Sequence, residues 1–233
     1  MTYNVGSFSK YMADSSSQVA SMISEAGADV VGLNEVDSCN TRHDVDQAAV
    51  LARQVGDWQS YFGRAMAYRG GAYGNAVIVP KDTKVIASYV VTLDKGDGSE
   101  QRSVAVVETD RYVYGACHLD YATVAAQLAQ VKTVNEWFKE KYSGCSKPVF
   151  FGGDMNALPD SEAIAALKES WDLLSVTDKT FSSQSPAKCI DYIFHYKSSA
   201  PVTVAGSAVM SRFSSASAMQ TSDHLPVYVD VKF

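Results

Sequence analysis

Apolar and polar positions follow two different periods along the chain. Between residues 15 and 26 the apolar residues recur at i, i+3, i+4 and i+7, which predicts a helix that Gly27 is well placed to end. Further helices are expected over residues 44–54, 123–142 and 160–170. Helical segments therefore occur throughout the sequence.

Short apolar runs without helical spacing predict strands buried on both faces. These runs cover residues 2–6, 28–35, 76–79, 103–109, 112–117, 149–151, 189–195, 202–209 and 226–232. The glycine-rich stretch 70–75 and the serine-rich stretch 211–222 are expected to be loops. Strands and helices alternate without a repeat or a long linker, which predicts one α/β domain over residues 1–233. Two packed sheets with helices outside fit this pattern, and a doubly wound sheet fits almost as well.

Composition narrows the function classes. The chain has 233 residues, of which 46% are hydrophobic and 20% charged, so a large core can form. The net charge is −6 and no run of Lys or Arg occurs, which disfavours extensive binding to duplex nucleic acid. A small phosphorylated substrate remains compatible with this charge, because a metal ion can neutralise it locally. No apolar run approaches the ~18 residues of a membrane span.

The cysteines and the first residues bear on the cellular compartment. Cys39, Cys117, Cys145 and Cys189 lack C-x-x-C spacing, which disfavours a zinc site and leaves disulfide pairing open. Cys117 lies in a predicted buried strand, so we expect it to be unreactive. The chain opens inside a predicted strand. We therefore expect an upstream segment such as a signal peptide, which would make the protein secreted or periplasmic; without one it would be cytoplasmic.

One stretch combines a buried strand with polar residues at its end. Residues 149–151 are followed by Gly152 and Gly153, where a side chain would block close approach of a ligand or a second backbone. Asp154 and Asn156 come next, two residues apart. A carboxylate beside an amide suits the activation of water next to an anionic group. The alternative is an ordinary strand followed by an Asx turn.

Other polar residues also occur at strand ends, where α/β sheets commonly bind ligands. They are Asn4, Glu35, His118, Asp191, Asp223 and His224. Each alone has a structural explanation, such as a surface ion pair or a turn. Two carboxylates about 4 Å apart, however, repel by roughly 4 kcal/mol at an effective dielectric of about 20. Several acids brought together therefore call for a cation, and oxygen donors without thiolates suit Mg²⁺ or Mn²⁺.

Six short motifs occur in the order found in a known family. They are Tyr3-Asn4-Val5, Asn34-Glu35, His118-Leu119-Asp120, Gly153-Asp154-Met155-Asn156, Ile190-Asp191-Tyr192 and Ser222-Asp223-His224-Leu225-Pro226. The series, which spans residues 2–230, resembles the endonuclease/exonuclease/phosphatase superfamily. The resemblance implies a four-layer α/β/β/α sandwich of two packed mixed sheets, with the active site at one edge.

The resemblance also implies a metal site. Glu35 would be the principal ligand of one Mg²⁺ or Mn²⁺ ion, with Asn4 and Asp223 close to the ion or its waters. The sequence departs from the family pattern at two positions. Gly6 stands where some nucleases have an acid, and Asn34 replaces the usual glutamine.

Catalytic roles follow from the same resemblance. Asp154 would orient or deprotonate the attacking water, and Asn156 would hold a phosphate oxygen. His224 would contact the phosphoryl group, with its ring fixed by Asp191. His118 would be a second contact to the phosphate or the leaving group. An acid in an apolar strand needs a partner, so we expect Asp191 and His224 to be hydrogen-bonded.

Two further segments resemble bacterial metal-dependent hydrolases. They are residues 37–47 and the stretch 70–75, and they suggest that Arg42, Tyr73 and Asn75 line the substrate pocket. For Arg42 a solvated loop charge is an equally good explanation.

Three function hypotheses result. The leading one is a Mg²⁺- or Mn²⁺-dependent phosphoesterase, expected to be a monomer, that acts on a small phosphomonoester or phosphodiester such as a sugar phosphate or phospholipid headgroup. The second is a nuclease acting on DNA or RNA, which the acidic charge disfavours. The third is a non-catalytic binding module, which would have little need for Asp154 together with the pair of Asp191 and His224.

Overall fold

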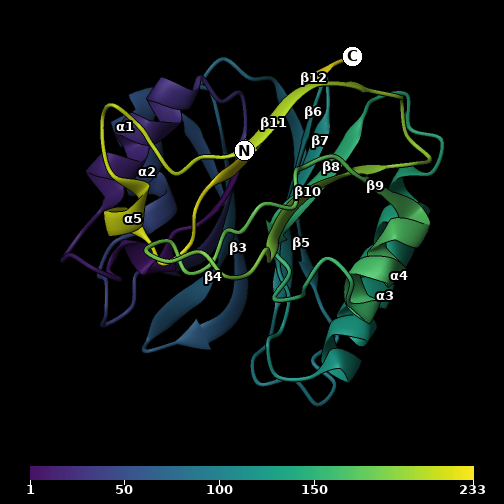
Figure 1. Cartoon of the computed structure of the whole chain (residues 1–233), viewed down its shortest axis with the longest axis horizontal. Helices are drawn as coiled ribbons and strands as arrows, with labels where there is room; N and C mark the ends of the chain where they lie inside the picture. Colours follow the sequence, from purple (N-terminus) through teal and green to yellow (C-terminus); the bar gives the residue numbers. More distant parts are fainter.

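The computed structural model describes residues 1–233 and contains two six-stranded sheets packed face to face (Figure 1). The strands of the first sheet are β1 (Thr2–Asn4), β2 (Val31–Ser38), β3 (Gln59–Tyr68), β4 (Gly71–Val79), β11 (Thr203–Val209) and β12 (Val227–Lys232). Their order is β11-β12-β1-β2-β4-β3. Parallel pairing of β1 with β2 and antiparallel pairing elsewhere make this sheet mixed.

The second sheet is built in the same way. Its strands are β5 (Val85–Thr92), β6 (Ser103–Thr109), β7 (Val113–His118), β8 (Val149–Asp154), β9 (Trp171–Leu173) and β10 (Asp191–Tyr196). Their order is β5-β6-β7-β8-β10-β9, and only β7 and β8 pair in parallel.

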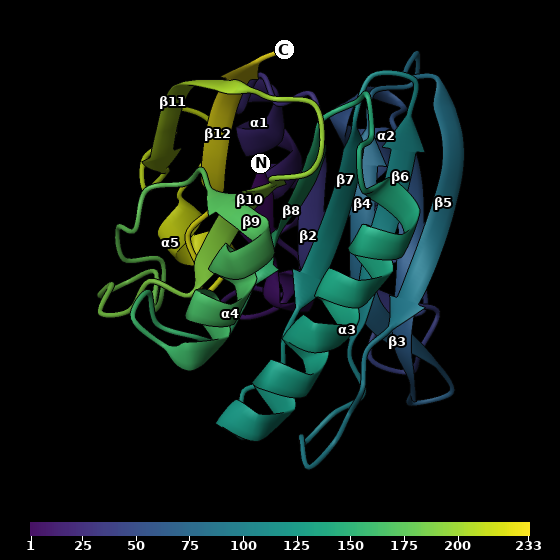
Figure 2. The same ribbon diagram turned by 90° about the vertical axis from the view of Figure 1, so that its right-hand side faces the viewer.

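Helices cover the outer face of each sheet. The helices are α1 (Ser16–Ala26), α2 (Gln47–Gly56), α3 (Val124–Tyr142), α4 (Glu162–Ser170), the short α5 (Ala218–Thr221) and a 3-10 turn η1 (Gly6–Phe8). Helices α1, α2 and α5 lie outside the first sheet (Figure 1), and Figure 2 shows α3 and α4 across the outer face of the second. The predicted four-layer sandwich is therefore confirmed. No helix is long and apolar enough to cross a membrane.

Three apolar layers hold the sandwich together. A cluster of 23 buried residues joins α3 and α4 to the second sheet, and a cluster of 18 joins α1 and α2 to the first. A third cluster of 8 residues, including Val77 and Tyr114, lies between the sheets. Burial of apolar side chains in all three layers is the main favourable term in folding. The sheets are consequently fixed against each other.

Most predicted elements are present with small shifts at their ends. Gly27 ends α1 in the left-handed conformation, with φ +61°. The predicted helix 44–54 begins later, because Asp46 acts as its N-cap and accepts a hydrogen bond from the Ala49 backbone N–H. Gly153 has φ +143°, and a Cβ there would lie 1.8 Å from the Cys117 carbonyl oxygen. The predicted close approach of a second backbone is thus confirmed.

The prediction of a loop over 70–75 is wrong. Residues 71–79 form β4, which pairs with β3 in a hairpin. Gly74 is required inside this sheet, because a Cβ there would lie 2.1 Å from the Gly63 carbonyl oxygen. Gly74 therefore allows close contact between two strands and does not indicate a turn. Strands β3, β5 and β9 and the short helix α5 were not predicted.

All four cysteines are free thiols. Cys117 is fully buried, and burial raises the pKa of its thiol far above the usual range. This environment agrees with the expectation that Cys117 acts as a small apolar residue.

Candidate active site

Three neighbouring strands of the second sheet present His118, Asp154 and Asp191 side by side. Strand β7 ends at His118, which pairs with Asp154 at the end of β8. Asp154 in turn pairs with Asp191 at the start of β10. In-register residues of adjacent strands project to the same face, so the backbone ladder brings these three side chains together.

The first sheet contributes Asn4 and Glu35. Glu35 has φ +58° at an irregularity of β2, a conformation that costs energy for a non-glycine residue and re-aims its side chain. Asn4 Nδ2 donates to Glu35 Oε1 at 3.1 Å and to Asp154 Oδ2 at 3.0 Å. The Gly6 N–H donates to Asn4 Oδ1 at 3.1 Å and so fixes the orientation of the amide. Asn4 therefore links the carboxylates of the two sheets.

Asn34, the residue in place of the usual glutamine, ties the sheets together behind the site. Its Nδ2 donates to the Cys117 carbonyl at 2.7 Å and to Asn75 Oδ1 at 2.8 Å. Its Oδ1 accepts from the Asp154 N–H at 3.0 Å. Asn75 is itself buried and donates to the Ser103 carbonyl at 2.8 Å. These contacts fix the position of Asp154 relative to the first sheet.

His224 lies between two carboxylates. Its Nδ1 is 2.9 Å from Asp191 Oδ2, so the predicted hydrogen bond across 33 positions is confirmed. Thr180 Oγ1 donates to the same oxygen at 2.5 Å. The other ring nitrogen, Nε2, lies 3.5 Å from Asp154 Oδ2. Burial alone would lower the pKa of His224, but the charges of Asp191 and Asp154 raise it to about 10. The ring is therefore an imidazolium at neutral pH.

His118 has the opposite surroundings. Its Nδ1 lies 3.2 Å from Arg102 Nη1, and its Nε2 lies 3.0 Å from Asn156 Nδ2. Both partners are N–H donors, so a neutral ring can accept from one of them, whereas a doubly protonated ring could accept from neither. Burial and then the charge of Arg102 hold the pKa of His118 well below its usual value. This ring is neutral.

Asp154 stands between the two histidines. Its Oδ2 lies 3.5 Å from the Nε2 atom of His118 and 3.5 Å from that of His224. The Asn156 N–H donates to its Oδ1 at 2.8 Å. Burial raises the pKa of Asp154 to about 7, although the positive charge of His224 opposes the shift. A carboxylate with a pKa near neutrality is suited to accept a proton in catalysis.

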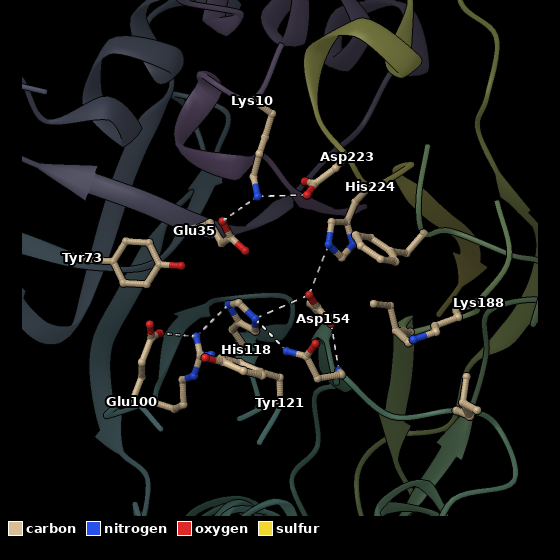
Figure 3. A pocket seen from close by; sticks show the side chains of 15 residues that line it. Lys10, Glu35, Tyr73, Glu100, His118, Tyr121, Asp154, Lys188, Asp223 and His224 are labelled. Atoms are coloured by element: carbon tan, nitrogen blue, oxygen red, sulfur yellow. Dashed lines mark hydrogen bonds and ion pairs between the residues drawn. The ribbon is translucent and has the colours of Figure 1, made fainter. Parts of the chain in front are cut away.

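These groups surround a cavity of about 560 Å³ (Figure 3). The predicted residues that line it are Glu35, Tyr73, His118, Asp154, Asn156, Asp223 and His224. Asn4 and Asp191 are buried and contact the lining residues through hydrogen bonds. Seven of the predicted site residues are thus exposed to one cavity, and these two support them.

Two predicted pocket residues do not line the cavity. Asn75 is committed to the contacts between the sheets. Arg42 is held by Asp37, with its Nε 2.7 Å from Asp37 Oδ2, and by Ser7 Oγ, which accepts from Arg42 Nη2 at 2.9 Å. Its guanidinium lies 5.9 Å from the centre of the Tyr73 ring. Arg42 instead lines a second, smaller cavity together with Ser7 and His43.

Several other lining residues belong to no sequence motif. They are Lys10, Glu100, Arg102, Tyr121, Leu158, Phe181 and Lys188, whereas Ile190, which also lines the cavity, belongs to the motif Ile190-Asp191-Tyr192. For two of them the sequence contains a weak indication of a role. Lys10 is the only Lys or Arg in the first 41 residues, and Arg102 directly precedes the buried strand β6. Arg102 is almost fully buried, and its Nε has no hydrogen-bond partner.

The donors of Glu35 and Asp223 fit a hard divalent cation. Both carboxylates are partly exposed, and each lies within 4 Å of Lys10 Nζ, so a cation between them is already accommodated. Asn4 turns its amide nitrogen toward Glu35, so it orients that carboxylate and offers the ion no oxygen.

A second group of possible metal donors is buried. Asp154, Asp191 and His224 each place one donor atom within 4.8 Å of the others. A histidine must be deprotonated to bind a metal ion, whereas both ring nitrogens of His224 face carboxylates and the ring is charged. Glu35 and Asp223 therefore form the better site.

Two mixed sheets with carboxylates, amides and histidines gathered at one edge define a hydrolytic class of α/β protein. The model of the Endonuclease/Exonuclease/phosphatase family matches residues 1–224, and the chain belongs to this family. Its members are phosphoester hydrolases that generally use divalent metal ions, so the chain is a phosphoester-cleaving enzyme. No curated protein matches the sequence.

Solved structures share the whole fold at low sequence identity. A mannosyl-6-phosphatase from Bacteroides thetaiotaomicron superposes with a TM-score of 0.78 and 18% identity, over 100% of this chain and 98% of that one. An endonuclease/exonuclease/phosphatase family protein from Leptotrichia buccalis has a TM-score of 0.77 and 18% identity, with the same coverage. D. rerio TDP2 in complex with a single-strand DNA product has a TM-score of 0.74 and 17% identity, over 100% and 97%. Similarity at this level establishes the fold alone.

Proposed function

We propose that the chain is a Mg²⁺- or Mn²⁺-dependent phosphoesterase whose substrate is a small phosphorylated molecule, with the phosphomonoester of a polyhydroxylated alcohol such as a sugar favoured. The observation that carries this proposal is the position of Asp154 Oδ2 between a charged and a neutral histidine. A base between two groups whose pKa values are driven apart is an arrangement typical of acid–base catalysis.

Different residues have separate roles in the attack of water on phosphorus. Asp154 holds the attacking water and takes its proton, while Asn4 donates to the same carboxylate and keeps it in place. The His224 imidazolium donates to a phosphoryl oxygen, where negative charge is concentrated in the transition state. Asn156 and His118, on the other side of Asp154, bind a further phosphate oxygen or the leaving group.

Glu35 and Asp223 would hold the metal ion. When bound, the ion neutralises charge on the phosphate oxygens. Asn4 keeps Glu35 aimed at this position through its 3.1 Å hydrogen bond.

The cavity supports a small substrate with hydroxyl groups. Its volume of about 560 Å³ suits one small molecule. Tyr73 and Tyr121 offer hydroxyls and ring faces on one side, and Glu100 offers a carboxylate that can accept from hydroxyl groups (Figure 3). Burial raises the pKa of Tyr73, so its hydroxyl keeps the proton and can donate. The similar fold of a mannosyl-6-phosphatase agrees with this choice.

A nuclease is the second candidate, because TDP2 with a DNA product has the same fold. A nucleic acid brings further phosphates to the cavity. The net charge of −6 disfavours these phosphates, and no run of basic residues attracts them. We therefore favour the small substrate.

Hydrolysis assays test the proposal. Release of phosphate from sugar 6-phosphates should exceed cleavage of a single-stranded oligonucleotide or an aryl phosphodiester. A chelator should abolish turnover, and Mg²⁺ or Mn²⁺ should restore it. Asp154→Asn, purified in parallel, controls for contaminating phosphatases. Chelator-resistant turnover would refute the metal requirement, and preferential cleavage of the oligonucleotide would favour the nuclease.

A further inference from the structure

Lys10 places its ammonium between two carboxylates at the cavity. Nζ lies 2.9 Å from Asp223 Oδ2 and 3.9 Å from Glu35 Oε2 (Figure 3). The side chain is 36% exposed and also lines the cavity. The ammonium therefore neutralises two acids that would otherwise repel each other.

The path of the Lys10 side chain depends on Gly6. A Cβ at residue 6 would lie 2.4 Å from Lys10 Cγ and 2.7 Å from Lys10 Cε. Gly6 also has φ +53°, a conformation that favours glycine. Any side chain at this position, an acid included, would displace the Lys10 stem. The observed path of the Lys10 side chain thus requires a glycine at residue 6.

We propose that Lys10 is the resident cation of the site formed by Glu35 and Asp223, and that its ammonium and a divalent ion occupy this site in turn. The inference rests on the proposed function, which assigns the divalent ion to these carboxylates. Two cations this close together repel strongly, so the ion cannot enter while the ammonium remains.

The flexible, partly exposed stem of Lys10 allows the exchange. A lysine side chain has four methylene groups and many rotamers, so the ammonium can leave without a change in the backbone. Because Lys10 lines the cavity, the displaced ammonium stays close enough to pair with a phosphate oxygen of the substrate. Lys10 thus closes the site in the metal-free enzyme and lowers its affinity for the ion.

Direct metal binding tests this inference without a substrate. Titration of the metal-free protein with Mn²⁺, followed by calorimetry and by the electron paramagnetic resonance signal of the free ion, gives the Kd. Lys10→Met should bind Mn²⁺ about 5- to 10-fold more tightly than wild type, which is the scale of losing two partly exposed ion pairs.

Lys188→Met is the matched control. Lys188 lines the same cavity and carries the same charge, but it forms no ion pair with Glu35 or Asp223. Its removal should change the Kd by less than about 2-fold, since screened charges at a distance act weakly. Circular dichroism confirms that each variant is folded.

The outcomes separate this inference from the proposed function. If wild type and Lys10→Met bind Mn²⁺ equally well, Lys10 does not compete, and only this inference is wrong. An equal gain in Lys10→Met and Lys188→Met would also overturn it, since charge alone would explain the effect. If none of the proteins binds Mn²⁺, the inference and the proposed metal dependence both fail.

Discussion

His118 and His224 approach the same oxygen of Asp154 at the same distance, 3.5 Å, yet they are in opposite charge states. His224 has carboxylate oxygens at both ring nitrogens, and they keep it protonated. His118 has N–H donors at both ring nitrogens, at 3.2 and 3.0 Å, and its burial followed by the charge of Arg102 keeps it neutral. The neighbours of each ring, and not its distance from the base, determine its charge.

This difference assigns the chemical roles. A charged histidine can stabilise negative charge on a phosphoryl oxygen, whereas a neutral one can only hydrogen-bond. If both histidines carried the same charge, the two sides of Asp154 would not differ in this way. Asp191 and Arg102, each next to one ring, are the residues that establish the contrast, so substitutions there test it.

Asp154→Asn should have the largest effect. The amide cannot take a proton from water, so we expect turnover to fall by about 10⁴-fold, the upper end for a positioned acid–base group. Asparagine keeps the size of the side chain, and the thermal midpoint should stay within a few degrees of wild type. The kcat and the midpoint, measured on one preparation, check both expectations. Turnover close to wild type would mean that another residue is the general base.

Asp191→Asn should lower turnover by about 10²- to 10³-fold. In wild type, the rate should rise with pH as Asp154 loses its proton near pH 7 and fall as His224 loses its proton near pH 10. Loss of the Asp191 charge lowers both pKa values, because that charge raises each of them. Both limbs of the pH profile should therefore move to lower pH.

The pH profile of Asp191→Asn, measured with a verified substrate and saturating metal, distinguishes catalysis from support of the fold. A smaller rate with an unchanged profile would mean that Asp191 only supports the structure. Thr180→Val is a matched control, because it removes the other donor to Asp191 Oδ2 and leaves the carboxylate charge in place.

Arg102→Gln should have the smallest effect, about 10-fold on kcat, as for the loss of one hydrogen bond. Burial holds the pKa of His118 down and the charge of Arg102 adds to this effect, so the pKa should rise partway toward its usual range without the guanidinium. Arg102→Lys restores a charged donor and should recover most of the activity. If both variants lose activity equally while they stay folded, the role of Arg102 does not depend on its charge.

The sequence predicted the parts of the fold that depend on local patterns. Apolar runs located most strands, and helical spacing located α1, α2, α3 and α4. The first part of β4 was predicted as a loop because of Gly71 and Gly74, whereas Gly74 serves close contact with β3. Strand β5 was also missed, although six of its eight residues are apolar; it is an edge strand on which Ile86 and Val90 stay exposed.

The candidate site was predictable where polar residues end buried strands. Asp154, Asp191 and His118 lie at such ends, and their grouping follows from strand register. Lys10 and Arg102 belong to no motif, because their roles depend on contacts between segments that pairing does not fix in advance. The neutral state of His118 could not be predicted without knowing that Arg102 lies beside it.

The most direct test of the two charge states is ¹⁵N NMR of the four histidine rings as a function of pH, with each ring assigned by substitution. The account predicts that His224 keeps both ring protons until about pH 10. It also predicts that His118 stays neutral with one ring proton at pH values below about 6.5, the usual midpoint of histidine. Titration of both rings together near pH 6.5 would contradict the account.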